Sequence, residues 1–167
     1  MRRYWFPKHY ADEAQRLRVP CGFVLAAACA YFSTPTRASL YIGLPVSFLG
    51  ILLRAWAAGH LAKNQQLATS GPYACIRNPL YLGTLTAASG FVIASKEPWL
   101  AVLFSLVFLM VYFPAIELEE QHLRKLFPAY AEYASHVRLL LPGGKPIPSI
   151  SRFRFTLYRR NREYQAL

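Results

Sequence analysis

The sequence has 167 residues, of which 54% are hydrophobic and only 16% are charged, with a formal net charge of +11. Ordinary soluble domains carry about a quarter charged residues, so the low charge content argues against a soluble enzyme. The positive balance fits nucleic acid or an anionic membrane surface, but long apolar runs exclude a nucleic-acid-binding protein. The composition predicts one integral membrane domain over residues 1–167.

Four apolar segments predict an all-α bundle of about four transmembrane helices. They cover approximately residues 19–32, 40–61, 80–94 and 99–116. A span needs roughly 20 apolar residues, with about 17 as a lower limit, so the first and third segments are short. Polar connections at 33–36 and 95–98 favour helical hairpins. Asp12 and Glu13 interrupt the basic start, which argues against a cleaved signal peptide.

Proline and cation positions predict the helix ends and the orientation. We expect Asn78 to cap the third segment with Pro79 at its first helical position, and Pro114 to kink the fourth. Cations gather before the first segment, between the second and third, and after the fourth, whereas the other side has only Arg37 and Lys96. Both termini, including the segment 1–18, are therefore expected on the cytoplasmic side of the membrane. We expect this membrane to be a bacterial inner membrane.

The region after the fourth segment predicts a cytosolic helix and a basic tail. Residues 116–137 have a helical composition, and 139–148 form a Pro/Gly-rich stop. Cations alternate with aromatic residues between 152 and 162. We expect the tail, 138–167, to lie on an anionic lipid surface, at about 1 kcal/mol per cation. A disordered basic tail is the alternative.

Two cytoplasmic stretches are richer in polar residues than a connection requires, namely 64–83 and 117–123. If the helices pack antiparallel, both stretches face one pocket. There Glu119 and Glu120 could bind an ammonium or sulfonium group, and Tyr73 and Tyr81 could stack on a purine. The alternatives are a solvated acidic face and tyrosines at the membrane interface.

Arg54 and His60 lie within and near the end of the second segment. An arginine inside a membrane span indicates function, here as an anchor for a phosphate or carboxylate, or else it extends to the interface. His60 is a candidate base for an amine acceptor, or an interfacial histidine.

The sequence LATSGPY at 67–73, followed by RNPLYLG at 77–83, resembles a signature of the isoprenylcysteine carboxyl methyltransferase and phospholipid methyltransferase group. That signature reads roughly L-V-T-x-G-x-Y and then R-H-P-x-Y-x-G. Downstream, the pair Glu119-Glu120 with Leu123, Phe127, Tyr130 and Tyr133 is similar to the acidic segment of the same group. The resemblance covers approximately residues 65–133.

The resemblance implies transfer of a methyl group from S-adenosylmethionine to a lipid or lipidated acceptor, with S-adenosylhomocysteine as product. Arg77 and Glu120 are the implied catalytic residues, and Arg77 would orient the acceptor. No metal is implied. The residues implicated in binding the cofactor are Gln65, Gln66, Leu67, Ala68, Tyr73, Asn78, Pro79, Leu80, Tyr81 and Glu119.

Departures from the signature leave the acceptor open. Asn78 and Gln65 stand where the group often has histidine, and neither can act as a base. Ala115 stands where the isoprenylcysteine enzymes have an arginine that is taken to bind the substrate carboxylate. An isoprenylcysteine-like carboxylate is the first expectation, and the ethanolamine headgroup of a phospholipid is the alternative. A nicotinamide-dependent enzyme of the sterol-reductase type and a non-catalytic lipid-binding protein remain as rivals.

Overall fold

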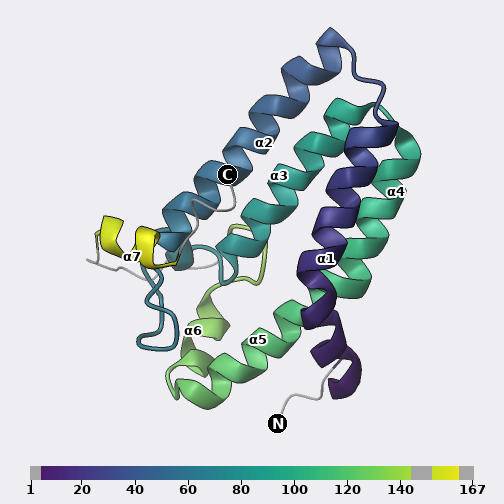
Figure 1. Ribbon diagram of the computed structural model, residues 1–167. Helices are drawn as coiled ribbons and strands as arrows, with labels where there is room; N and C mark the ends of the chain where they lie inside the picture. Colours follow the sequence, from purple (N-terminus) through teal and green to yellow (C-terminus); the bar gives the residue numbers. More distant parts are fainter. Residues whose placement is uncertain (1–4, 144–151, 162–167) are drawn as a thin grey trace. The chain divides into compact units, whose positions relative to one another are not determined.

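The computed structural model describes residues 5–143 and 152–161, and the regular elements of these ranges are helical (Figure 1). The expectation of an all-α protein is therefore confirmed. The parts of the predicted tail at 144–151 and 162–167 lie outside the described residues. In chain order the elements are α1 (Lys8–Phe32), α2 (Arg37–Ala58), a 3₁₀ turn η1 (Gly71–Ala74), α3 (Pro79–Ser95), α4 (Pro98–Val107), a π-helical turn η2 (Phe108–Tyr112), α5 (Phe113–Leu126), α6 (Tyr130–His136) and α7 (Phe155–Arg160).

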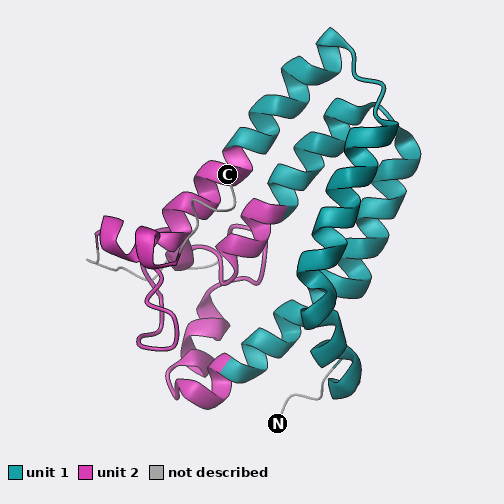
Figure 2. Cartoon of the chain, in the orientation of Figure 1, with its two compact units in different colours: residues 1–48, 85–122 teal, residues 49–84, 123–167 magenta. Residues whose placement is uncertain are grey.

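The chain forms two compact units, coloured separately in Figure 2. The first unit comprises Met1–Phe48 and Leu85–His122, and the second comprises Leu49–Thr84 and Leu123–Leu167. The boundary passes through α2, α3 and α5, so each of these helices contributes residues to both units.

In the first unit, α1 packs against α4 and the π turn. The two predicted hairpin connections meet at one end of this unit. Thr34 donates its backbone N–H to the carbonyl of Ser95 (3.0 Å) and its hydroxyl to the carboxylate of Glu97 (2.7 Å). The short connections therefore support each other as well as reversing the chain.

The π turn lies directly before Pro114, the proline that was expected to kink the fourth segment. Proline has no N–H, so Pro114 cannot donate to the carbonyl of Met110 four residues earlier. The hydroxyl of Tyr10, on α1, donates to that carbonyl instead (2.6 Å). The helix therefore continues through Pro114 to Leu126, as one run of 29 residues, with a π turn in place of a helix end.

Small residues allow α2 and α3 to approach closely within the first unit. A Cβ added at Gly43 would lie 2.5 Å from the carbonyl oxygen of Gly90. Ser47 donates its hydroxyl to the carbonyl of Ala87 (2.9 Å). Small residues that permit backbone contact are typical of helix pairs in membranes, where burial of apolar surface provides little driving force.

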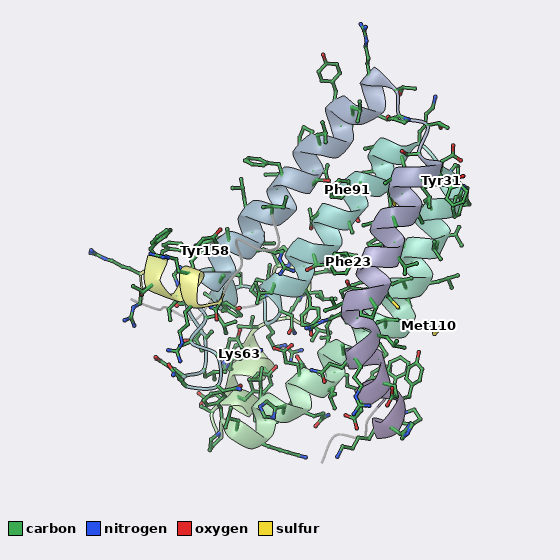
Figure 3. The ribbon with its side chains drawn as sticks, viewed as in Figure 1. Phe23, Tyr31, Lys63, Phe91, Met110 and Tyr158 are labelled. Atoms are coloured by element: carbon green, nitrogen blue, oxygen red, sulfur yellow. The ribbon has the colours of Figure 1, made fainter. Side chains whose placement is uncertain are left out.

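Among the described residues, two helical runs are long and apolar enough to cross a membrane, α2 and the continuous α4–η2–α5 run. Most of each is exposed, as expected for surfaces that face lipid rather than a protein core. Exposed apolar side chains also occur on the other helices, for example Phe23 and Phe91 (Figure 3). The third expected segment is apolar but forms a helix of only 17 residues, and the first begins at Lys8 rather than near residue 19.

The cytosolic helix expected over 116–137 is interrupted. α5 ends at Leu126 and α6 begins at Tyr130, with a turn across Phe127-Pro128-Ala129. Pro128 cannot continue the hydrogen-bond ladder of a helix, which explains the break.

We predict that Gly90→Ala destabilises the protein. The added Cβ would overlap the hydroxyl and backbone nitrogen of Ser47, so α2 and α3 must separate. Overpacking of this kind costs about 1–3 kcal/mol. Thermal unfolding in detergent measures the effect. Gly22→Ala is the matched control, because its Cβ would meet only the hydroxyl of Tyr112, at 3.2 Å. Equal melting temperatures for Gly90→Ala and the unaltered protein would contradict the close approach.

We also predict that Tyr10→Phe lowers the melting temperature, because the carbonyl of Met110 loses its donor, at a cost of about 1 kcal/mol. Tyr31→Phe removes a hydroxyl from a side chain that is 83% exposed and serves as the control. In a Pro114→Ala background the new N–H can serve Met110, so the cost of Tyr10→Phe should fall. If Tyr10→Phe costs as much in the Pro114→Ala background as in the unaltered protein, the Tyr10 hydroxyl does not replace the N–H that Pro114 lacks.

Candidate functional site

The candidate site is the segment between α2 and α3, residues 59–78, together with the start of α3. Apart from the 3₁₀ turn η1 (Gly71–Ala74) it has no regular structure, so its backbone groups need partners from elsewhere. All of it belongs to the second unit. The segment carries the first of the two motifs found in the sequence.

α6 and the chain that follows it supply those partners. The backbone N–H of Arg77 donates to the carbonyl of Arg138 (2.9 Å), and that of Asn78 donates to the carbonyl of Leu139 (3.2 Å). Ile76 and Arg138 form a parallel bridge. The hydroxyl of Tyr133 donates to the carbonyl of Tyr73 (2.7 Å) in a buried bond. These contacts fix the end of the segment immediately before α3.

A small hydrophobic cluster supports the segment from α6. Its buried members are Tyr130, Tyr133 and Val137. Leu67 from the site segment packs against this cluster, as do partly buried apolar residues from the end of α5 onward, namely Leu123, Phe127 and Ala134. The paired tyrosines of the second motif therefore hold the first motif in place. This is a scaffolding role that the sequence pattern did not reveal.

His60 joins α2 to the middle of the segment. Its Nδ1 lies 2.9 Å from the hydroxyl oxygen of Ser70, which is buried. Gly71 adopts φ +58°, and a Cβ there would collide with the His60 ring, so two independent reasons require glycine. Burial lowers the pKa of His60, which favours the neutral imidazole.

Asn78 has an unsatisfied amide group. The residue is 6% exposed, and its Nδ2 has no hydrogen-bond partner among the residues that the structure describes. A buried donor without an acceptor is costly and therefore needs an explanation, one of which is a bound ligand. Its backbone carbonyl accepts from the N–H of Leu82 (3.0 Å), and α3 begins at Pro79 as expected.

Arg54 lies on the apolar helix α2, and its side chain contacts α3 at Gly83 and Thr84. Its guanidinium donates to the hydroxyl of Thr84, which in turn donates to the carbonyl of Leu80 (3.0 Å). A Cβ on Gly83 would collide with the Arg54 side chain, so glycine provides the space for it. Thr84 is thus a polar partner for an arginine at the depth of an apolar helix.

The structure places ten of the expected site residues in the second unit around this segment, together with Arg54 and His60. Gln65 and Gln66 are exposed; Leu67, Ala68, Arg77 and Leu80 are half-buried; and Tyr73, Asn78, Pro79 and Tyr81 are buried.

The remaining expected residues, Glu119 and Glu120, lie on α5 in the first unit, where Glu119 is half-buried and Glu120 is buried. Their approach to the segment stays a prediction. Nearby, the carboxylate of Glu117 accepts from the backbone N–H groups of Trp5 (2.6 Å) and Phe6 (3.3 Å), which gives it a structural role. Ala115 is fully buried.

Sequence reasoning missed several residues that shape the site. Ser70 and Thr84 are short polar side chains whose partners are distant in sequence or on another helix, so no local pattern marks them. Arg138 and Leu139 act through backbone carbonyls, which any residue type provides. Among the described residues there is no group of three histidine, cysteine, aspartate or glutamate side chains arranged to hold a metal ion.

Comparison with curated proteins gives bacterial and plant relatives. The cobalt-zinc-cadmium resistance protein CzcN of Cupriavidus metallidurans is 32% identical over 105 residues, covering 59% of this chain and 49% of its own length. The nickel-cobalt-cadmium resistance protein NccN of Alcaligenes xylosoxydans is 30% identical with the same coverage. The chain thus spans about half the length of these two relatives.

A probable protein-S-isoprenylcysteine O-methyltransferase of Oryza sativa is 31% identical over 153 residues, covering 77% of this chain and 80% of the plant protein. No solved structure matches the chain. Residues 46–130, which include the whole candidate segment, match the phospholipid methyltransferase family. This chain therefore belongs to the phospholipid methyltransferase family of membrane proteins, with distant homology to the isoprenylcysteine methyltransferases.

Proposed function

We propose that this protein is a membrane enzyme that transfers a methyl group from S-adenosylmethionine to a lipid-like acceptor. The observation that carries the proposal is the buried amide of Asn78, whose Nδ2 has no acceptor among the described residues. It lies in the middle of the motif on which the family resemblance rests. Adenine ring nitrogens and a carboxylate, both present in S-adenosylmethionine, are acceptors that this donor could satisfy.

The residues that would hold the cofactor are Gln65, Gln66, Leu67, Ala68, Tyr73, Asn78, Pro79, Leu80 and Tyr81, with Glu119 from α5. When bound, the cofactor supplies an electrophilic methyl group on a sulfonium centre. The hydrogen bonds from Arg77 and Asn78 to the chain after α6 fix the backbone in advance. Such preorganisation matters because methyl transfer depends mainly on alignment and exclusion of water.

The acceptor is proposed to enter from the bilayer and to be oriented by Arg77, whereas Glu120 is proposed to help Glu119 hold the cofactor. Arg54, held by Thr84, is a candidate anchor for a carboxylate or phosphate of the acceptor. The homology to isoprenylcysteine methyltransferases favours a carboxylate acceptor.

A second candidate is the amine of a phospholipid headgroup, because the position of the expected carboxylate-binding arginine is the fully buried Ala115. Profiling of methyl transfer to prenylcysteine analogues and to phosphatidylethanolamine separates the two candidates. In either case we propose about four spans with both termini in the cytoplasm, because the cations lie mostly on one side. The bacterial relatives CzcN and NccN favour a bacterial inner membrane.

We predict that S-adenosylhomocysteine at about 100 times its dissociation constant stabilises the detergent-solubilised protein by on the order of 2.7 kcal/mol, measured by thermal unfolding. Asn78→Leu should abolish most of this stabilisation. The same substitution should leave the ligand-free protein equally stable or more stable, because it removes a buried donor without a partner. A loss of ligand stabilisation without a loss of ligand-free stability distinguishes a ligand-binding role of Asn78 from a structural one.

Asn78→His, the residue type typical of the family at this position, is the control and should retain the response. A stabilisation by NADPH alone would instead indicate a reductase, and no response to either ligand would indicate a non-catalytic lipid-binding protein. A ligand-free Asn78→Leu protein that is clearly less stable would contradict the unpaired amide.

We further predict that the folded state, in which the His60 ring contacts Ser70, favours the neutral imidazole and loses stability when His60 is protonated. In the unfolded chain His60 titrates near its ordinary value of about 6.5, and burial lowers this pKa in the folded protein. Below about 6.5 the unfolded state binds more protons, so stability falls as the pH decreases toward the folded pKa and levels off below it.

The melting temperature of the unaltered protein should therefore fall more between about pH 7.5 and about pH 5.5 than that of His60→Gln, which can still bond Ser70. His9→Gln alters an exposed histidine and should follow the unaltered protein. Identical pH profiles for His60→Gln and the unaltered protein would show that His60 has no such role.

A further inference from the structure

Residues 152–161, here termed the clasp, bind the carboxyl end of α2 within the second unit. The backbone N–H of Arg154 donates to the carbonyl of Gly59 (2.9 Å). The side-chain Nδ2 of Asn161 donates to the carbonyls of Ala58 and Leu61, each at 2.9 Å. The last carbonyls of a helix have no partner within the helix, so the clasp satisfies groups that α2 leaves open.

Aromatic contacts complete the attachment. Phe153 lies against Gly59 so closely that a Cβ there would collide with its ring. The Phe153 ring also contacts His60 edge-on, with centroids 6.2 Å apart, and His60 contacts Trp56 in the same manner at 6.4 Å. The clasp is therefore attached directly to the end of a helix that is long and apolar enough to cross a membrane.

The outward side of the clasp is cationic and aromatic. The sequence RFRFTLYRRN contains four arginines and no acidic residue. Arg152 and Arg159 are exposed, and Phe155 is 62% exposed. Phe155 stacks on Tyr158 of α7 (5.8 Å between centroids; Tyr158 is labelled in Figure 3). Cations interleaved with aromatic rings fit the headgroup region of an anionic leaflet.

We propose that the clasp is a docking surface for anionic phospholipid headgroups, in the leaflet next to the carboxyl end of α2. Three observations point to lipid rather than to a soluble anion or nucleic acid. The clasp is fixed to the end of an apolar helix, the half-exposed Trp56 lies on the last turn of that helix, and exposed Phe155 accompanies the cations. The proposal depends on membrane location and not on methyl transfer.

Docking also reaches the candidate site, because the guanidinium of Arg160 donates to the side-chain oxygen of Gln65 (3.2 Å). Gln65 is the first of the residues proposed to hold the cofactor. Lipid that restrains the clasp thereby restrains one end of the site segment.

The test uses the full chain in lipid nanodiscs of phosphatidylcholine alone, or with about a third phosphatidylglycerol, and measures amide hydrogen exchange across 152–161. Anionic lipid should slow exchange, and high salt should remove this protection. Arg152→Gln/Arg159→Gln should reduce the protection about 25-fold, since each cation near an anionic surface contributes about a factor of five. Neither substituted side chain makes the contacts with Gly59, Ala58 or Leu61.

The matched control is Lys63→Gln/Lys125→Gln, which removes the same charge from exposed positions of the same unit and should keep the protection. Equal exchange of the unaltered protein in the two kinds of nanodisc would overturn the proposal. If the control variant loses as much protection, the effect depends on net charge and not on the clasp, which would also overturn the proposal. Protection by inorganic phosphate in phosphatidylcholine nanodiscs would assign the site to a soluble anion instead.

Discussion

The candidate site depends on how an irregular segment between two apolar helices satisfies its backbone. Water is scarce near the hydrocarbon region, so each unpaired N–H or carbonyl is costly there. α6 and the chain after it meet this requirement: the carbonyls of Arg138 and Leu139 accept from Arg77 and Asn78, and the Tyr133 hydroxyl of α6 donates to the carbonyl of Tyr73. The two motifs of the sequence are thus structurally coupled, because the tyrosines of one fix the backbone of the other.

The side-chain amide of Asn78 departs from this pattern of backbone hydrogen bonds. The backbone N–H of Arg77 is hydrogen-bonded, and Pro79 has no N–H. The Asn78 side chain, in contrast, is buried, and its Nδ2 has no acceptor among the described residues. Functional sites are where proteins tolerate such a group, since the ligand completes it. The glycine at 71 and the neutral His60 serve the same end, because they set the path of the segment without adding charge near it.

Much of this architecture could be predicted from the sequence, and the reasons for the exceptions are physical. Apolar runs, polar hairpins and the Asn78-Pro79 helix start depend on local chemistry, so they were recognised. The start of α1 at Lys8 was missed because its first turns are polar, and the break at Pro128 because the flanking residues have helical composition. The roles of Ser70, Thr84 and Arg138 depend on partners distant in sequence or on another helix, which a single sequence does not display.

The π turn at Phe108–Tyr112 has a consequence for how the second motif is presented. A π turn accommodates one additional residue, and one residue corresponds to about 100° of rotation around a helix axis. The part of α5 that belongs to the first unit is therefore turned relative to the apolar stripe of α4, including the carboxylates of Glu119 and Glu120. A helical wheel drawn from Pro98 would assign these carboxylates to the wrong face. The angular phase of the acidic pair is set by Pro114 and by a tyrosine hydroxyl on another helix, not by the residues around the pair.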